Sequence, residues 1–235
     1  MIFRQLFDAE SSTYTYVLGD EKTREAVIID PVIEHVARDL KLLAELDLKL
    51  VYALDTHVHA DHVTALSTLR DRTGCKTVVS EKAGVDCADR LVNEKDRIVF
   101  GDHVLFARET PGHTGGCVTF VLGKDATMAF TGDALLIRGT GRTDFQEGDA
   151  RVLYRSVHEK IFSLPSTCLV YPAHDYKGHT CSSVGEEKAH NPRLGGDRDV
   201  EAFVEIMSKL DLKYPKKIDV ALPANLQCGA KEHAH

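Results

Sequence analysis

The sequence lacks several features that would assign a protein to a class at once. No apolar run approaches the roughly 18–20 residues that a membrane-spanning helix needs. The first residues, MIFRQLF, do not show the charged and then apolar layout of a secretory signal. No block of Lys or Arg is present, and a formal charge of -7 should repel a phosphate backbone. These absences predict a cytoplasmic protein that binds neither membranes nor nucleic acid.

Cysteine pairs in a C-x-x-C arrangement are also missing. The six cysteines are scattered along the chain, at positions 75, 87, 117, 168, 181 and 228. An even count allows disulfides, but 235 residues are enough to bury a core without such cross-links. We therefore predict reduced and mostly buried thiols with a structural role, including Cys117 and Cys181, which lie near histidines in the sequence.

Internal repeats, low-complexity segments and linkers rich in Gly, Ser or Pro are absent as well. A hydrophobic content of 43% and a charged content of 28% are typical of a globular chain. Without a boundary between dissimilar regions, residues 1–235 are predicted to form one domain, with only the last few residues disordered.

Short strands and helices alternate along the chain, which predicts an α/β fold. Apolar, β-branched and aromatic residues between turn residues indicate strands at 3–7, 14–18, 26–30, 50–54, 77–79, 97–100, 104–109, 118–122, 128–131 and 168–171. Helices are expected from their pattern at 33–46, 63–70, 150–162 and 200–210. A Pro-containing tail follows the last of these helices.

Histidine and aspartate side chains follow four of the predicted strands, where open α/β sheets usually carry their chemistry. Imidazole nitrogen and carboxylate oxygen are good ligands for Zn, Fe or Mn. Chance does not often place such residues after successive strands, so we predict a metal site at one edge of a sheet. The candidate ligands are His57, His59, Asp61, His62, His113, Asp133 and His174.

The remaining histidines are expected to have ordinary roles, because a single histidine is usually a surface residue or a hydrogen-bonded core residue. This expectation applies to His35, His103, His158 and His190. His233 and His235 belong to a tail that is expected to fray.

The segment Thr56–His62, with the sequence THVHADH, resembles the signature of the metallo-β-lactamase superfamily. His113 in PGHT, Asp133 in TGD and His174 in PAHDY match its later motifs in order, and the resemblance runs from about residue 12 to about residue 229. It implies the metallo-β-lactamase fold, a four-layer αββα sandwich in which two sheets pack between outer helices. The fold alone does not set the reaction, because the superfamily includes hydrolases, oxidoreductases and oxygenases.

Finer motifs resemble those of the persulfide dioxygenases, a family similar to glyoxalase II. These motifs are Gly139–Gln146 (GTGRTDFQ), Tyr171–Tyr176 (YPAHDY) and Leu222–Gly229 (LPANLQCG). The resemblance implies oxidation of glutathione persulfide with O2 and water to sulfite and glutathione, at one non-haem Fe(II) per chain. Thr140 stands where this family often has cysteine, a departure that suggests a bacterial subgroup.

The same resemblance implies a role for each candidate ligand. His57, His113 and Asp133 match the three Fe(II) ligands of the dioxygenases, and no protein nucleophile is needed. Positions that bind a second metal in the related hydrolases, and that are expected to be empty here, are matched by His59, Asp61, His62 and His174. The resemblance also implies a homodimer.

Three residues are candidate contacts for the glutathione part of the substrate. Arg142 carries a guanidinium fork that suits a carboxylate, or alternatively forms a surface ion pair with Asp144. Tyr176 lies where glyoxalase II enzymes hydrogen-bond the tripeptide, or alternatively packs in the core. Lys177 would assist Tyr176, or is simply solvated. Tyr176 and His174 are also candidates for hydrogen bonds that orient a metal ligand.

Two other functions remain open at this point. A dinuclear glyoxalase II-like thioester hydrolase, that is a hydroxyacylglutathione hydrolase, would use every candidate ligand to hold two metals that activate a bridging hydroxide. Against it, the segment after His174 is short for the helical substrate domain of those hydrolases, and residues 142–145 fit the dioxygenases better. A non-catalytic module that binds persulfide or metal is the other alternative, and the complete ligand set argues against it.

Overall fold

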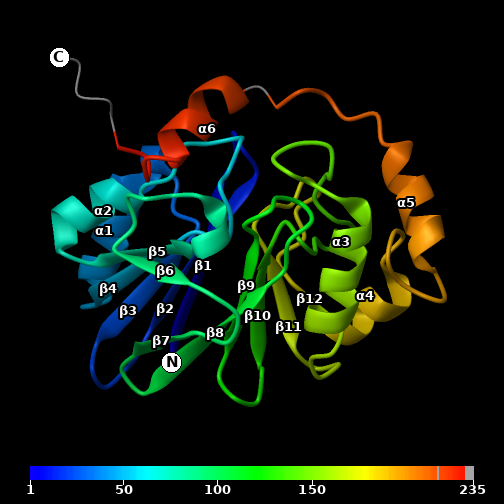
Figure 1. Ribbon diagram of the computed structural model, residues 1–235. Helices are drawn as coiled ribbons and strands as arrows, with labels where there is room; N and C mark the ends of the chain where they lie inside the picture. The colour runs from blue at the N-terminus through cyan, green and yellow to red at the C-terminus, as the bar shows by residue number, and fades with distance from the viewer. Residues whose placement is uncertain (216, 231–235) are drawn as a thin grey trace. The chain divides into compact units, whose positions relative to one another are not determined.

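The structure, a computed structural model, describes residues 1–215 and 217–230, which form two compact units (Figure 1). The first unit contains Met1–Val92, Val99–Val104 and the segment that begins at Tyr214, and the second contains Asn93–Ile98 and Leu105–Lys213. The disorder expected at the C-terminal end, with His233 and His235, lies outside the described residues. The single domain expected for residues 1–235 stays a prediction.

The first unit is built on a mixed six-stranded sheet in the order β1-β2-β3-β4-β5-β6. The first three strands pair antiparallel, whereas β3, β4, β5 and β6 run parallel and therefore end at one edge of the sheet. The strands are Ile2–Asp8 (β1), Thr13–Gly19 (β2), Glu25–Ile29 (β3), Lys49–Leu54 (β4), Lys76–Ser80 (β5) and Arg90–Val92 (β6).

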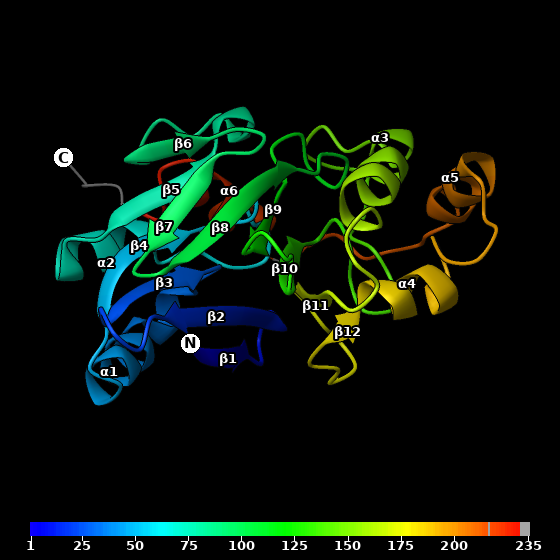
Figure 2. The same ribbon diagram turned by 90° about the horizontal axis from the view of Figure 1, so that it is seen from below.

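Three helices pack on one face of this first sheet, and Figure 2 shows α1 alongside β1 to β4. They are α1 (Val36–Glu45, after a 3-10 turn at Ile33–His35), α2 (Leu66–Thr73) and α6 (Ile218–Asn225). Strand residues Val17 and Ile28 point to the same face and pack in a buried core with Leu43 of α1 and Leu66 of α2. Leu222 of α6 packs against this core, which places the C-terminal helix in the first unit.

The second unit is built on most of another six-stranded sheet, in the order β12-β11-β10-β9-β8-β7, of which the part of β7 and β8 within Val99–Val104 belongs to the first unit. Because β8, β9 and β10 pair antiparallel while β10 and β11 are parallel, β8, β10 and β11 all end at the same edge. The strands are Arg97–Phe100 (β7), His103–Glu109 (β8), Val118–Leu122 (β9), Met128–Gly132 (β10), Leu169–Pro172 (β11) and Ser182–Ser183 (β12).

Three helices also pack on one face of the second sheet. They are α3 (Ala150–Ser156, continued by a π-helical turn at Val157–Ile161), α4 (Val184–His190) and α5 (Val200–Ser208). Val121 and Val170 of the strands form a buried core with Leu153 of α3 and Phe203 of α5. Among residues 1–215 and 217–230, no helix is long and apolar enough to cross a membrane.

Most elements expected from the sequence are present, with ends shifted by a few residues. The prediction missed β6, β12, α4 and α6. At the start of α4, Ser183 and Glu186 form a capping box, and this Ser-x-x-Glu pattern is a helix signal that the sequence carries. The sequence did not predict α6 because it contains Pro223, and proline normally disfavours a helix.

The prediction that all cysteines are reduced is wrong. Cys87 and Cys228 form a disulfide within the first unit, with Cα atoms 6.0 Å apart. The other cysteines are thiols, of which Cys75, Cys117 and Cys168 are buried and Cys181 is exposed. The two paired residues are 141 positions apart, so their spacing gave no sign that folding brings them together.

Candidate metal centre

The first group of predicted ligands lies on residues 55–65, named here the ligand loop, which connects β4 to α2. Since β3 and β4 are parallel neighbours, Asp30 after β3 and the ligand loop after β4 lie at the same edge of the sheet. The ring centroids of His57 and His59 are 4.0 Å apart, and those of His59 and His62 are 4.4 Å apart. The structure therefore brings these three buried imidazoles together within the first unit.

Asp30 is the main support of the ligand loop. Its carboxylate accepts hydrogen bonds from Thr56 N at 2.7 Å and from Thr56 Oγ1 at 2.9 Å, and lies 3.1 Å from His59 Nε2. Burial raises the pKa of Asp30, while the neighbouring His57 opposes this shift. Its backbone has a φ of 52°, a left-handed conformation that costs a non-glycine residue about 1 kcal/mol or more. The surrounding hydrogen bonds offset that cost.

Further side chains of the first unit hold the rest of the ligand loop. Thr13, at the start of β2, has its Oγ1 3.2 Å from Asp61 Oδ2 and 3.2 Å from His62 Nδ1. Thr64 Oγ1 donates to Asp55 Oδ1 at 3.0 Å, and burial raises the pKa of Asp55 well above its usual range. Asp61 and His62 also contact each other at 2.9 Å, so each acidic or imidazole group of the loop has an ordered neighbour.

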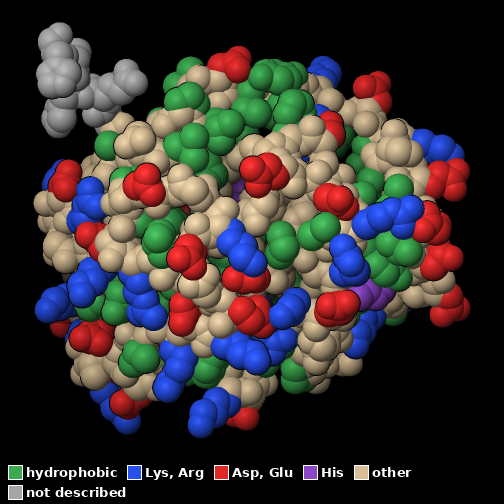
Figure 3. Space-filling view, viewed as in Figure 1, with side chains coloured by type: hydrophobic (Ala, Val, Ile, Leu, Met, Phe, Trp, Pro, Cys, Tyr) green, Lys and Arg blue, Asp and Glu red, His purple; other side chains and the backbone are tan. Residues whose placement is uncertain are grey.

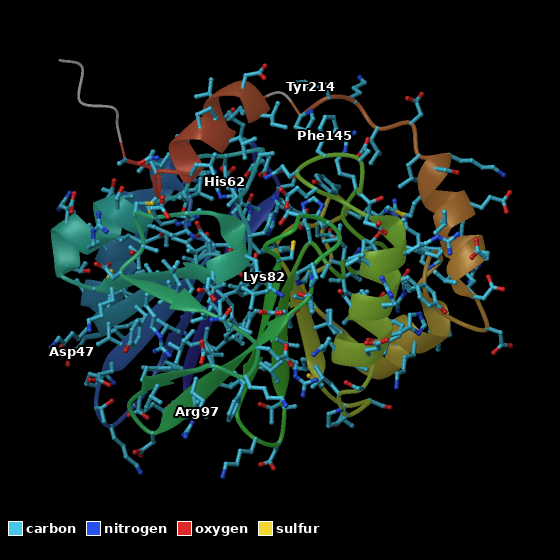
Figure 4. All side chains as sticks on the ribbon, in the orientation of Figure 1. Asp47, His62, Lys82, Arg97, Phe145 and Tyr214 are labelled. Carbon is cyan, nitrogen blue, oxygen red and sulfur yellow. A yellow bond between two sulfur atoms is a disulfide. The ribbon has the colours of Figure 1, made fainter. Side chains whose placement is uncertain are left out.

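The C-terminal helix α6 binds the ligand loop through Asn225. This buried side chain donates to the carbonyl oxygens of His59 and His62, both at 2.8 Å, and accepts from Thr64 N at 2.8 Å. Figure 4 labels His62 beside α6. The sequence motif Leu222–Gly229 pointed to the family, but nothing in it revealed that Asn225 would contact a loop more than 160 residues away.

The second group of predicted ligands lies at the ends of β8, β10 and β11, at one edge of the second sheet. His113 Nε2 lies 3.6 Å from Asp133 Oδ2, and His174 Nδ1 lies 2.7 Å from Asp133 Oδ1. His113 Nδ1 donates to the carbonyl oxygen of Arg142 at 2.7 Å, which leaves Nε2 as the nitrogen with a lone pair. Asp133 therefore stands between the two imidazoles of this unit.

Gly141 fits tightly against the second group. A Cβ atom at this position would lie 2.7 Å from Asp133 O and 2.7 Å from His113 Nδ1. The backbone of Gly141 also donates to Asp133 O at 2.7 Å. Gly141 is thus required in the 139–146 motif, because His113 and Asp133 already occupy the space that a side chain would need.

The donor atoms within each unit fit a first-row metal ion. Two ligand atoms that each lie about 2.0–2.2 Å from one ion are roughly 3–3.6 Å apart, which His113 Nε2 and Asp133 Oδ2 satisfy. Nitrogen and oxygen donors of this kind suit Fe, Zn or Mn. The first unit presents three imidazoles and a carboxylate after the end of β4, so each unit carries its own group of donor atoms at a strand edge.

The predicted substrate contacts lie in the second unit. Arg142 forms a two-point ion pair with Asp144, at 2.6 and 2.7 Å, which holds the pKa of the Asp144 carboxyl below its usual range. The guanidinium also donates to Lys213 O at 2.9 Å and lies 4.4 Å from the ring of Phe145, which Figure 4 labels. The ion pair that was the alternative for Arg142 therefore exists.

Tyr176 is not a core residue. It is 71% exposed, and its ring stacks on that of His174 with centroids 6.2 Å apart. Lys177 is exposed as well, and its backbone nitrogen donates to Asp175. Both side chains therefore lie on the surface, two and three residues after the predicted ligand His174.

Three of the remaining histidines have contacts of other kinds. His35 Nε2 lies 2.8 Å from Asp8, and His103 Nε2 lies 3.4 Å from Asp20. His158 stacks on Tyr154 with ring centroids 4.0 Å apart, and burial lowers its pKa.

Comparison with known proteins places the chain in a family. The metallo-β-lactamase superfamily matches residues 9–174. "Persulfide dioxygenase ETHE1, mitochondrial" of Mus musculus is 55% identical over 232 residues, which are 98% of this chain and 90% of that protein. The Homo sapiens protein of the same name matches with the same identity and coverage. The chain belongs to the persulfide dioxygenase family.

A solved structure supports the assignment to this family. The crystal structure of ETHE1 from Myxococcus xanthus has a TM-score of 0.94 and 54% sequence identity, and the match covers 98% of this chain and all (100%) of the other. The predicted metallo-β-lactamase fold, with two mixed sheets that carry helices, is confirmed. The predicted dioxygenase, an oxidoreductase, is also confirmed, and the glyoxalase II-like alternative is less supported.

The predicted cytoplasmic location is wrong. The mouse and human relatives are both named as mitochondrial proteins, which points away from the cytoplasm. The prediction had used only absences in the sequence, and an absent charge block or apolar run does not identify a compartment.

Proposed function

We propose that the chain oxidises glutathione persulfide with O2 and water to sulfite and glutathione, at one Fe(II) held by His57, His113 and Asp133. The observation that carries the proposal is the match to persulfide dioxygenases over nearly the full length of both chains. The donor atoms of the two units support it, because two imidazoles and one carboxylate are a common ligand set for Fe(II) that reacts with O2.

The proposed site takes His57 from the first unit and His113 and Asp133 from the second. When bound, Fe(II) with these ligands supplies one place where both the substrate sulfur and O2 can be held side by side. The chain contributes the orientation of the ligands. Arg142 O fixes the tautomer of His113, and Thr56 Oγ1, 3.0 Å from His57 Nδ1, orients the other imidazole.

The remaining candidate ligands are proposed to stay without a second metal. The three histidines among them each contact a carboxylate in the same unit: His59 with Asp30, His62 with Asp61 and His174 with Asp133. These contacts use Nε2 of His59 and Nδ1 of His62 and His174, and leave the other nitrogen of each ring as a possible ligand. In the proposed enzyme they keep the polar groups around the Fe(II) ligands in fixed positions.

Arg142, Tyr176 and Lys177 are proposed to bind the glutathione part of the substrate. A cleft in the second unit is lined by Arg142, Thr143, Asp144, Met207, Leu210 and Leu212, so a cation and apolar side chains meet there. Tyr176 offers an exposed hydroxyl for the tripeptide, and its ring is held by His174. Lys177 adds a positive charge beside it, suited to a glutathione carboxylate.

A dinuclear thioester hydrolase is the second candidate, favoured by the presence of all the side chains that two metals would need. Anaerobic purification followed by metal analysis separates the two. We expect one iron per chain, with consumption of one O2 for each sulfite formed from glutathione persulfide. Two metals per chain with thioester hydrolysis and no O2 uptake would overturn the dioxygenase proposal. We also propose a homodimer, which sedimentation equilibrium would measure.

A further inference from the structure

The segment Asn225–Gly229 fits closely against the ligand loop and the start of α2. In addition to the three hydrogen bonds of Asn225, the carbonyl oxygen of Cys228 accepts from Ser67 N at 3.0 Å. A Cβ at Gly229 would lie 1.9 Å from Thr64 O, so only glycine allows this approach. This segment therefore holds the ligand loop in place, and we call Asn225–Gly229 the brace.

The brace has one covalent anchor, the disulfide between Cys228 and Cys87. The preceding helix α6 is only 8 residues long, contains Pro223 and has no side-chain cap at its N-terminus. A helix this short is marginal by itself in water. The position of Asn225, three residues before Cys228, consequently depends on how firmly Cys228 is held.

The two cysteines of this disulfide differ in exposure. Cys228 is completely buried, whereas Cys87 is partly exposed and precedes the short edge strand β6. Figure 3 shows hydrophobic side chains gathered over α6, where Val220 is 69% exposed, so this helix lies at the surface. A small thiolate from solution therefore reaches Cys87 Sγ more readily than the sulfur of Cys228.

We propose that the Cys87–Cys228 disulfide holds the ligand loop in place and that small thiols can reduce it. Asn225 is the positioning residue through which the disulfide acts on the loop. A low-molecular-weight thiolate attacks Cys87 Sγ, the S–S bond breaks, and Cys228 leaves as a thiolate that takes up a proton. A second thiolate then displaces Cys87. The balance is one protein disulfide plus two thiols giving two protein thiols and one small disulfide.

Opening the disulfide frees the brace to fray. Asn225 then holds the carbonyl oxygens of His59 and His62 for only part of the time, and the loop that carries His57 loses its fixed geometry. This consequence for the metal rests on the proposed function, in which His57 is an Fe(II) ligand. Glutathione, the thiol product of that reaction, is a reductant of the required class.

Hydrogen exchange of the metal-free chain tests the brace without any assay of activity. Reduction with dithiothreitol should speed exchange of the Thr64 and Ser67 amides about tenfold or more, because both donate to the brace. Cys87→Ser should exchange as fast as the reduced chain and should not respond further to reductant. Cys181→Ser, which removes an exposed thiol outside the brace, should respond like the unchanged chain. Equal protection before and after reduction would overturn the proposal.

A thiol count tests the disulfide itself. The denatured, unreduced chain should show four reactive thiols, and the reduced chain all six. Six thiols in the unreduced protein, purified without reductant under air, would show that the disulfide does not form and would overturn the proposal.

Asn225→Asp tests the link to the metal, since it keeps the size and one acceptor but loses the amide donor. With the disulfide intact, this variant should release iron to a chelator about tenfold faster, as other supports of metal ligands do. Reduction should then add little. If the chain bound no iron, the proposed function would fail, but the hydrogen-exchange result would still show whether the brace depends on the disulfide. Unchanged iron release in Asn225→Asp would show that Asn225 does not position the ligand loop.

Discussion

The two units hold their candidate ligands in different ways. In the first unit, the ligand loop depends on side chains from distant segments, Asp30 after β3 and Asn225 in the C-terminal helix. In the second unit, Asp133 contacts both imidazoles directly, and the backbone around Gly141 and Arg142 closes against them. One ligand set is thus fixed by long-range side-chain contacts, and the other by contacts between neighbouring loops.

Removing one ligand from each unit gives the largest expected effect. If both units bind the same iron, His57→Ala and His113→Ala should each lose most of the iron and at least about 1000-fold of the O2 consumption, because two remaining ligands hold Fe(II) poorly. Metal analysis and an oxygen electrode measure both. Retained iron and rate in either variant would show that its unit does not take part.

Weakening the support of each unit should give intermediate and comparable effects. Asp30→Asn keeps one oxygen for Thr56 N but replaces the oxygen that accepts from Thr56 Oγ1 with an NH2 donor, and Gly141→Ala forces a Cβ against His113 and Asp133. Each should lower iron affinity about 10–100-fold. The matched control is Gly139→Ala, where a Cβ would meet only Leu136 at 3.8 Å. An effect of Gly139→Ala as large as that of Gly141→Ala would contradict the steric explanation.

Arg142→Ala separates substrate binding from metal binding within the second unit. His113 contacts the backbone oxygen of Arg142, which alanine retains, so the iron content should not change. Loss of the guanidinium should raise KM for glutathione persulfide about tenfold, the effect of a lost charged hydrogen bond of about 1.4 kcal/mol. Steady-state kinetics with parallel iron analysis measure the two quantities. An unchanged KM would exclude Arg142 from the substrate site and leave only its ion pair with Asp144.

The smallest effect is expected far from the ligands, at Asp20 in the first unit. Hydrogen bonds from Thr23 N and Asp102 N lower the pKa of Asp20 to about 2, from an ordinary value of 3.8. A lowered pKa stabilises the folded state at pH above about 4, and this contribution disappears as the pH falls toward 2. Asp20→Asn should therefore lower Tm slightly at pH 7, and the difference should shrink below pH 4. A constant difference down to pH 2 would refute this origin.

Local patterns predicted most of the strands and placed the candidate ligands after them, whereas the four-layer fold was implied by the family resemblance. The run Leu50–Leu54 within β4 is continuously apolar, and His113, Asp133 and His174 each lie within four residues of the end of a strand, which the sequence pattern indicated. The brace was not predictable, because a helix containing Pro223 breaks the local rule and its contacts are made across more than 160 residues. Single-sequence patterns describe neighbours along the chain and not such distant pairs.

An enzyme that handles persulfides is exposed to sulfur transfer onto its own cysteines. Only the thiolate form of a cysteine accepts or donates sulfur at a useful rate, and burial raises the pKa of Cys75 and takes that of Cys168 to about 11. At neutral pH the Cys168 side chain is therefore almost entirely the unreactive thiol. The hydrophobic core of the second unit thereby keeps the Cys168 thiol unreactive toward the persulfides that the enzyme binds.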